Sequence, residues 1–81
     1  MRSNKKTYAQ MACSVIVKQL LKKEVKSITT SESLILFSEY CKKNNIQCHE
    51  HSAVQRALHT LEYVKRIKRD KLTLGLYLKI Q

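Results

Sequence analysis

The sequence contains no proline, no tryptophan and a single glycine, Gly75, among its 81 residues. Flexible linkers and low-complexity tracts are rich in Gly, Ser and Pro, and no stretch of this chain has such a composition. No internal repeat is found either. We therefore expect a single domain over residues 7–81, preceded by a flexible basic arm at residues 1–6.

Long hydrophobic runs are also missing. No stretch approaches the ~18 apolar residues that cross a bilayer, and the first residues lack the apolar core of a signal peptide. The three cysteines, Cys13, Cys41 and Cys48, are an odd number without close paired spacing, which argues against a disulfide framework. The sequence therefore predicts an intracellular protein, cytoplasmic, nucleoid-associated or nuclear, with reduced thiols and no membrane contact.

Acidic residues are scarce, since 6 Asp and Glu stand against 16 Lys and Arg, for a formal net charge of +10 at pH 7. The acids are scattered, with no paired carboxylates and no Gly-rich phosphate loop. Cys48 and His49 are chain neighbours whose side chains diverge, so they do not form a nucleophile and base. We expect no enzymatic activity, no cofactor and no small-molecule substrate. The positive charge attracts polyanions, nucleic acid first, although solubility alone is an alternative.

Apolar residues recur at steps of three and four along three segments, which predicts three helices. The predicted helices run from Thr7 to about Glu24, from about Thr30 to Lys43, and from about Glu50 to Val64. Thr7 with Gln10, and Thr29 with Glu32, can form capping boxes at the first two. Residues 25–28 predict a short strand, and Asn44-Asn45 can supply the left-handed residue that ends the second helix.

The first predicted helix has a wide apolar arc. Its polar residues form a single stripe, made of Gln10, Ser14, Lys18 and Lys22. So wide an arc needs cover on two sides, from the last strand or from a partner subunit. A homodimer formed through this helix is therefore one hypothesis.

Near the C-terminus the period of the pattern changes from 3.6 to 2. Aliphatic residues occupy alternate positions, namely Leu72, Leu74, Leu76, Leu78 and Ile80. This alternation predicts a strand that buries its aliphatic face and turns Tyr77 outward, toward a possible sugar or phosphate. Residues 65–69 predict a shorter strand, and Arg69, Asp70 and Lys71 predict a tight connection between the two. The C-terminal segment is therefore predicted to be a β-hairpin.

The predicted order is helix, short strand, helix, turn, helix and hairpin. Within it, the segment SAVQRALHTLEYVKRIKR, residues 52–69, resembles the third helix and first wing strand of the winged helix-turn-helix DNA-binding superfamily. The core positions of that helix would be Val54, Ala57, Leu58 and Leu61. The resemblance implies an α+β winged helix-turn-helix fold with three helices, a short strand and a C-terminal β-hairpin wing, and it implies binding to double-stranded DNA. The link at residues 46–49 departs from the family, because it lacks the small turn residue often found there.

The polar face of the third predicted helix is expected to enter the major groove. The expected base-reading residues are Ser52, Gln55, Arg56, His59 and Thr60. Gln suits adenine and Arg suits guanine through bidentate hydrogen bonds. His51 and the first-turn amides are expected to hold a phosphate, since a helix N-terminus carries partial positive charge. An ordinary solvent-exposed face is the alternative.

Five cations lie within seven residues around the predicted hairpin, namely Lys65, Arg66, Lys68, Arg69 and Lys71. They are expected to contact backbone phosphate or the minor groove, although blocking of edge pairing is an alternative use. Together with the third helix they predict a transcriptional regulator. Two other readings stay open: an architectural, replication or partition factor that binds chiefly through the wing, and a winged-helix module that binds protein or RNA.

Four metal-capable residues, Cys41, Cys48, His49 and His51, lie within eleven positions. Their spacing matches no known zinc signature, and Cys41 falls on the apolar arc of its helix. We therefore expect no metal at this cluster.

Overall fold

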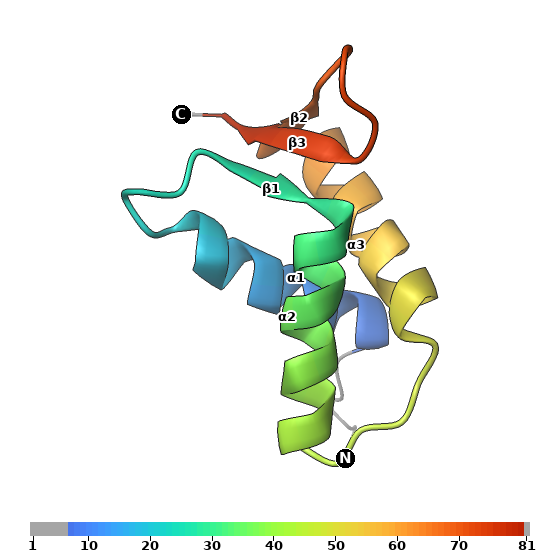
Figure 1. The fold of residues 1–81 in the computed structure, drawn as a ribbon. Helices are drawn as coiled ribbons and strands as arrows, with labels where there is room; N and C mark the ends of the chain where they lie inside the picture. The colour runs from blue at the N-terminus through green and yellow to red at the C-terminus, as the bar shows by residue number, and fades with distance from the viewer. Residues whose placement is uncertain (1–6, 81) are drawn as a thin grey trace, which may run out of the picture.

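Residues 7–80 are described by the computed structural model, which shows three helices and a small three-stranded antiparallel sheet (Figure 1). The elements are α1 (Tyr8–Leu20), β1 (Ser27–Thr29), α2 (Thr30–Lys43), α3 (Glu50–Tyr63), β2 (Ile67–Arg69) and β3 (Leu76–Lys79). The α+β class and the order of the elements are as predicted. The basic arm expected at residues 1–6 lies outside the described residues. Over the described part of the chain, every helix is too short or too polar to span a bilayer.

The predicted helix starts are confirmed by their hydrogen bonds. At α1, the Gln10 amide donates to the Thr7 hydroxyl at 3.1 Å and the Thr7 amide donates to the Gln10 side chain at 2.9 Å. Thr29 and Glu32 form the same reciprocal pair at α2. Each box satisfies two amide groups that a helix start leaves without a partner. The capping patterns in the sequence therefore locate both starts correctly.

The predicted end of α2 is also confirmed. Asn45 is left-handed, with φ of 54°, and the Ile46 amide donates to the Cys41 carbonyl at 2.9 Å. This is a Schellman ending with Asn in the place usually taken by Gly. The same ending closes α3, where Lys65 has φ of 63° and the Arg66 amide donates to the Leu61 carbonyl. Lys65 and Arg66 therefore lie in a turn and not in the strand predicted for them.

The first helix is shorter than predicted, because α1 ends at Leu20 and not near Glu24. The next residues form turns that lead the chain toward β1. In this segment the carbonyl groups of Lys22 and Val25 accept hydrogen bonds from the Lys79 ammonium of β3, at 3.3 Å and 3.4 Å. A contact from a distant strand thus holds the connection between α1 and β1 against the sheet.

The core lies between the three helices and one face of the sheet. Its α3 residues are Ala53, Val54, Ala57, Leu58 and Leu61, all buried, which confirms the apolar stripe predicted for this helix. Phe37 of α2 and Ile16 of α1 are fully buried beside them. α1 packs on both α2 and α3, so much of its wide apolar arc is covered within the chain.

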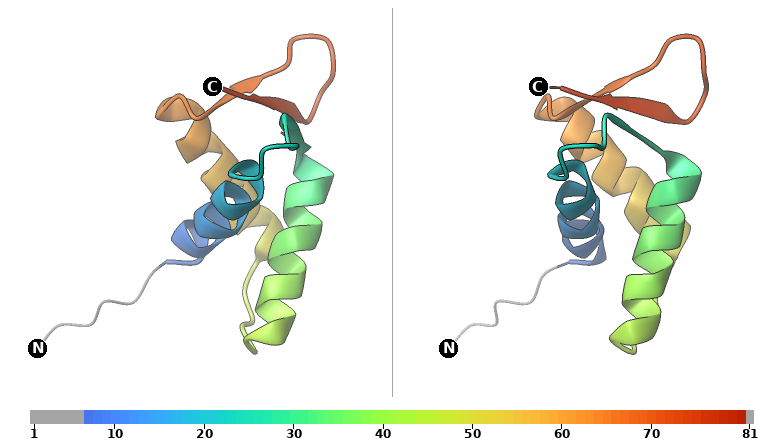
Figure 2. Two further views of the ribbon diagram at one scale, coloured as in Figure 1. Left: turned by 90° about the vertical axis from the view of Figure 1, so that its left-hand side faces the viewer. Right: turned by 60° about the vertical axis from the view of Figure 1, so that its left-hand side comes forward.

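The sheet has the order β1-β3-β2, with β3 in the middle and both pairings antiparallel. Tyr77 of β3 lies between Ile28 of β1 and Arg69 of β2. The sheet lies at one end of the helices, and the loop between β2 and β3 extends beyond it (Figures 1 and 2). This loop, residues 70–75, is named the hairpin loop below.

The predicted orientation of the last strand is wrong. Tyr77 faces the core and is 7% exposed, whereas Leu72 and Leu74 are 95% and 97% exposed and Leu78 and Ile80 are also exposed. The strand begins only at Leu76, and the connection is six residues long in place of the tight turn predicted. Strand periodicity defines two faces but does not say which one is buried. Here the pairing of Tyr77 with buried Ile28 turns the aromatic face inward.

The inverted strand can be tested by matched substitutions of neighbouring residues. We predict that Tyr77→Ala lowers the free energy of unfolding by about 3 kcal/mol, because it empties a buried aromatic site. Leu78→Ala should lower it by less than about 1 kcal/mol, because that side chain lies on the outer face. Urea denaturation of both variants measures the difference. A larger loss for Leu78→Ala would contradict the orientation described here.

Candidate nucleic-acid interface

The exposed side of α3 carries all five residues predicted to read bases, namely Ser52, Gln55, Arg56, His59 and Thr60. We call this set the reading face. All five are exposed, whereas the intervening apolar residues of the helix are buried. His51, predicted to hold a phosphate, is exposed in the first turn of the same helix. The structure therefore brings the predicted α3 residues onto one accessible surface.

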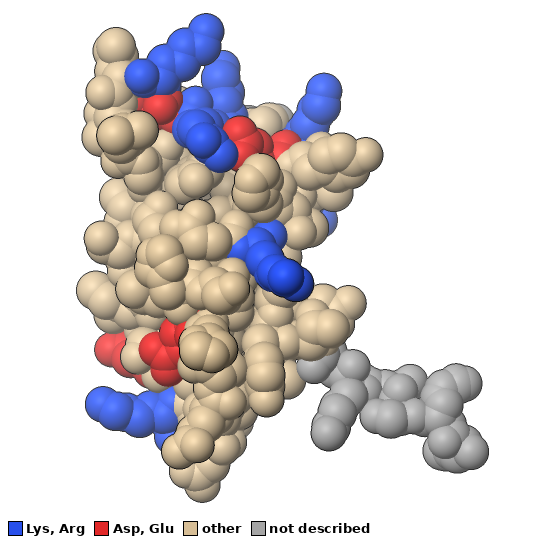
Figure 3. Space-filling view, turned by 90° about the vertical axis from the view of Figure 1, so that its right-hand side faces the viewer, with Lys and Arg blue, Asp and Glu red and all other residues tan. Residues whose placement is uncertain are grey.

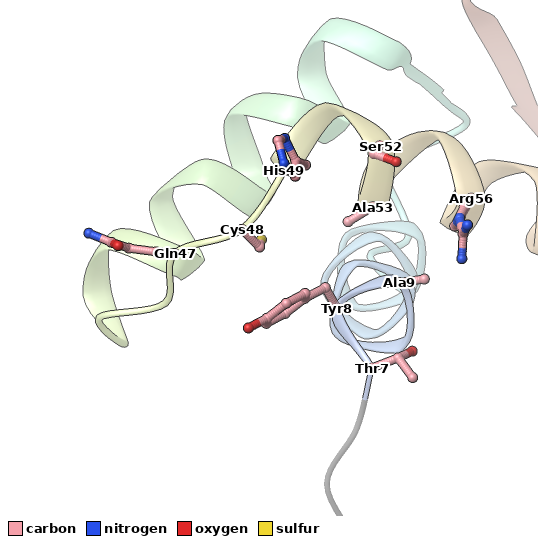
Figure 4. A pocket seen from close by; sticks show the side chains of 9 residues that line it. All are labelled: Thr7, Tyr8, Ala9, Gln47, Cys48, His49, Ser52, Ala53 and Arg56. Carbon is pink, nitrogen blue, oxygen red and sulfur yellow. The ribbon is translucent and has the colours of Figure 1, made fainter.

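A groove of about 670 Å³ adjoins the N-terminal half of the reading face (Figure 4). Three segments line it, through Thr7, Tyr8, Ala9, Gln47, Cys48, His49, Ser52, Ala53 and Arg56. Tyr8 extends from the start of α1 toward the connector before α3, and Arg56 extends from α3 alongside α1. The groove therefore joins two reading-face residues to polar side chains from elsewhere in the chain.

Sequence reasoning missed the groove residues outside α3, above all Tyr8, Gln47 and His49. Tyr8 fits the apolar pattern of its helix, yet it is 48% exposed. Only the packing of α1 against α3 brings the starts of the two helices together. No signal in the sequence marks this neighbourhood, because it depends on a tertiary contact.

The start of α3 differs from those of the other helices. His49 is its N-cap and makes no side-chain capping hydrogen bond, whereas α1 and α2 both begin with capping boxes. The backbone amides in the first turn of α3 therefore have no side-chain acceptor at the N-cap. Such amides are donors suited to phosphate oxygens, and the Ser52 hydroxyl and the Arg56 guanidinium, which line the same groove, are further donors.

The hairpin concentrates the positive charge. Figure 3 shows the side on which α3 lies in Figure 1, and Lys and Arg side chains gather at its upper end, the level of the hairpin. The five predicted hairpin cations, Lys65, Arg66, Lys68, Arg69 and Lys71, are all exposed. They come from the turn after α3, from β2 and from the hairpin loop. A polyanion lying along α3 would therefore meet cations at the C-terminal end of the helix.

Arg69 differs from the other four hairpin cations because it is held within the fold. Its guanidinium donates to the Glu62 carboxylate of α3 at 3.0 Å and lies 5.8 Å from the centre of the Tyr77 ring. The hydrogen bond to Glu62 raises the pKa of Arg69 further. Over residues 7–80 no other hairpin cation is held in an ion pair. Arg69 therefore links α3 to β2, while the other four remain available to a ligand.

The cysteine and histidine cluster weighed for metal binding is spread over different environments. Cys41 is buried in the core, whereas His49 and His51 are exposed. Within the described part of the chain, no three His, Cys, Asp or Glu side chains are grouped closely enough to hold a metal ion. Burial, and then the neighbouring Cys48 thiol, raises the pKa of Cys41 from 9.0 to about 11. At neutral pH Cys41 is therefore a protonated core residue.

Comparisons of the chain with models of known protein families, with curated proteins and with solved structures found no match. The geometry of the chain itself is therefore what indicates a function. Three features of the surface stand out, namely the reading face of α3, the groove beside it and the hairpin cations.

The raised pKa of Cys41 predicts a pH dependence of stability. The folded state holds this proton more tightly than the unfolded chain, so the stabilisation is complete below about pH 9 and is lost as the pH rises toward 11. By about pH 10 the loss should reach about 1 kcal/mol. Urea denaturation at several pH values should show a steeper alkaline loss for the wild-type protein than for Cys41→Ala. Equal pH slopes would contradict this assignment.

Proposed function

We propose that this protein is a winged helix-turn-helix protein that binds double-stranded DNA and acts as a transcriptional regulator. In this proposal α3 lies in the major groove, and the β2–β3 hairpin is the wing that contacts the sugar-phosphate backbone. The observation that carries the proposal is the exposed row of hydrogen-bond donors on α3, which ends at the hairpin cations.

The arrangement of the elements supports the proposed fold. Three helices precede the hairpin, and the short strand before α2 completes a sheet of order β1-β3-β2. The Schellman turn at Lys65 and the pair between Arg69 and Glu62 hold β2 against the end of α3. The wing therefore has a set position relative to the helix that would read the bases.

The dimensions and chemistry of α3 suit the major groove. Its 14 residues span about 21 Å, and an α-helix fits a groove about 12 Å wide. Gln55 can bind adenine and Arg56 can bind guanine, each through two hydrogen bonds. Arg56 also lines the groove of the protein beside α1, and a side chain placed there could bind a backbone phosphate instead of a base.

Substitutions on the reading face should lower sequence-specific binding. We predict that Gln55→Ala and Arg56→Ala each weaken binding to the preferred duplex by about 1–3 kcal/mol, because each removes a bidentate contact to a base. Lys18→Ala is the matched control, since Lys18 lies beside Leu36 and Tyr40 of α2 and outside the reading face. The preferred duplex comes from selection in a random pool, and fluorescence anisotropy measures affinity. Unchanged affinity for both variants would exclude them from base reading.

The hairpin cations should determine the salt dependence of binding. Each phosphate contact contributes about 0.9 to the slope of log affinity against log salt, so Lys68→Ala with Lys71→Ala should reduce the slope by about 1.8. The control double variant, Lys18→Ala with Lys22→Ala, removes the same charge beside α2 and should leave the slope nearly unchanged. Equal slopes for the two double variants would show that the total charge of the protein, and not the position of the cations, determines the salt dependence.

A regulator and an architectural factor differ in their affinity for DNA of unrelated sequence. A protein that reads bases through α3 loses affinity for shuffled competitor DNA, whereas one that binds chiefly through the wing does not. Competition of the preferred duplex with a shuffled duplex of equal length measures this ratio. A ratio near one would favour the architectural role over the proposed regulator.

A further inference from the structure

The tip of the hairpin loop presents two leucine side chains to solvent. Leu72 is 95% exposed and Leu74 is 97% exposed, more than any other large hydrophobic residue of the described chain. The loop extends beyond the sheet in both views of Figure 2. Neither leucine takes part in the core, so packing within the fold does not explain them. Apolar side chains displayed in this way gain free energy when a partner removes them from water.

The hairpin loop holds these leucines outward by a set of hydrogen bonds. The Asp70 carboxylate accepts from the amides of Leu72 at 3.2 Å and Thr73 at 2.8 Å. At the base of the loop, the Asp70 amide donates to the Leu76 carbonyl, and the Thr30 amide donates to the Gly75 carbonyl at 2.8 Å. Gly75 has φ of 79°, which only glycine adopts without strain. The loop tip therefore has a defined conformation, and a backbone hydrogen bond joins the base of the loop to the start of α2.

The residues around the tip indicate what kind of partner it meets. Lys71 lies in the loop beside Leu72, and Lys68 lies in β2 below it, both exposed. A second copy of this chain would bring like charges together at the tip, which opposes that pairing. A polyanion with an apolar interior matches both features, and duplex DNA has phosphates outside and stacked bases inside. Leucine is among the apolar residues that minor-groove proteins insert between base pairs.

We propose that Leu72 and Leu74 form a wedge that inserts between base pairs from the minor groove while α3 lies in the adjacent major groove. This inference rests on the proposed function and adds a mode of binding to it. Lys68 and Lys71 hold the phosphates on either side, and the leucines partly unstack one base step. The DNA bends toward the major groove as a result, and flexible pyrimidine-purine steps are preferred where the wedge enters.

The test compares the double variant L72S/L74S with the control I35S, which removes an exposed aliphatic side chain from α2. Both variants should fold, because the replaced side chains lie outside the core, and thermal melts check this. Affinity for a mixed-sequence duplex is measured by anisotropy at low salt. Bending is measured by ligase-catalysed circularisation of duplexes shorter than the persistence length of about 150 base pairs. This assay does not require the wedge to bind at one known position.

We expect the wild-type protein and I35S to bind the duplex and to increase circularisation. L72S/L74S should bind about tenfold more weakly and, at saturation, should lose most of the increase in circularisation. If the wild-type protein binds the duplex without promoting circularisation, or if L72S/L74S matches it in both assays, the wedge is wrong and the proposed function stands.

Two further results would overturn the wedge for other reasons. Absence of duplex binding by the wild-type protein would remove both the proposed function and the wedge. Anionic phosphatidylserine vesicles serve as a second probe, because a basic apolar tip also suits a membrane surface. If L72S/L74S loses only vesicle binding and behaves as wild type on duplex DNA, the partner of the tip is a membrane.

Discussion

Burial of one apolar stripe of α3 determines which side chains of this helix face solvent and where the hairpin begins. Val54, Ala57, Leu58 and Leu61 pack against α1 and α2 with almost no exposed surface, and this packing sets the rotation of the helix about its axis. With 3.6 residues per turn, the side chains between these positions must then face outward. Gln55 and Arg56 are therefore available to a ligand because their neighbours form the core. The same packing of α3 on α1 forms the groove beside Arg56.

The hairpin is joined to this helix by local and tertiary contacts that act together. Lys65 has a left-handed backbone conformation that turns the chain after α3. The Arg69 side chain then forms an ion pair with Glu62 near the end of this helix. Tyr77 anchors the inner face of the sheet next to Ile28, which leaves the aliphatic outer face and the loop tip exposed. The hairpin cations therefore adjoin the C-terminal end of α3, the helix that carries the reading face. In the proposed function, that connection lets one duplex meet both.

Sequence patterns were informative where structure is determined locally. Thr7 with Gln10 and Thr29 with Glu32 located two helix starts, and Asn45 marked a helix end, because each depends on neighbours in the chain. The alternating leucines predicted the wrong buried face for β3. That face is determined by the pairing of Tyr77 with β1, a strand about fifty residues earlier in the chain. The groove could not be predicted at all, because α1 and the connector meet only in the tertiary fold. Local rules therefore identified the base-reading candidates and missed their surroundings.

Titration of isotope-labelled protein with duplex DNA, followed by amide NMR shifts, would show which residues contact the DNA. We predict that the largest shifts map to α3 between Ser52 and Thr60 and to the hairpin between Lys68 and Leu74. The amides around Leu36 and Tyr40 of α2, which lie next to α1, should shift little. Shifts concentrated on that α1–α2 surface, or spread evenly over the molecule at saturating DNA, would contradict binding through α3 and the hairpin.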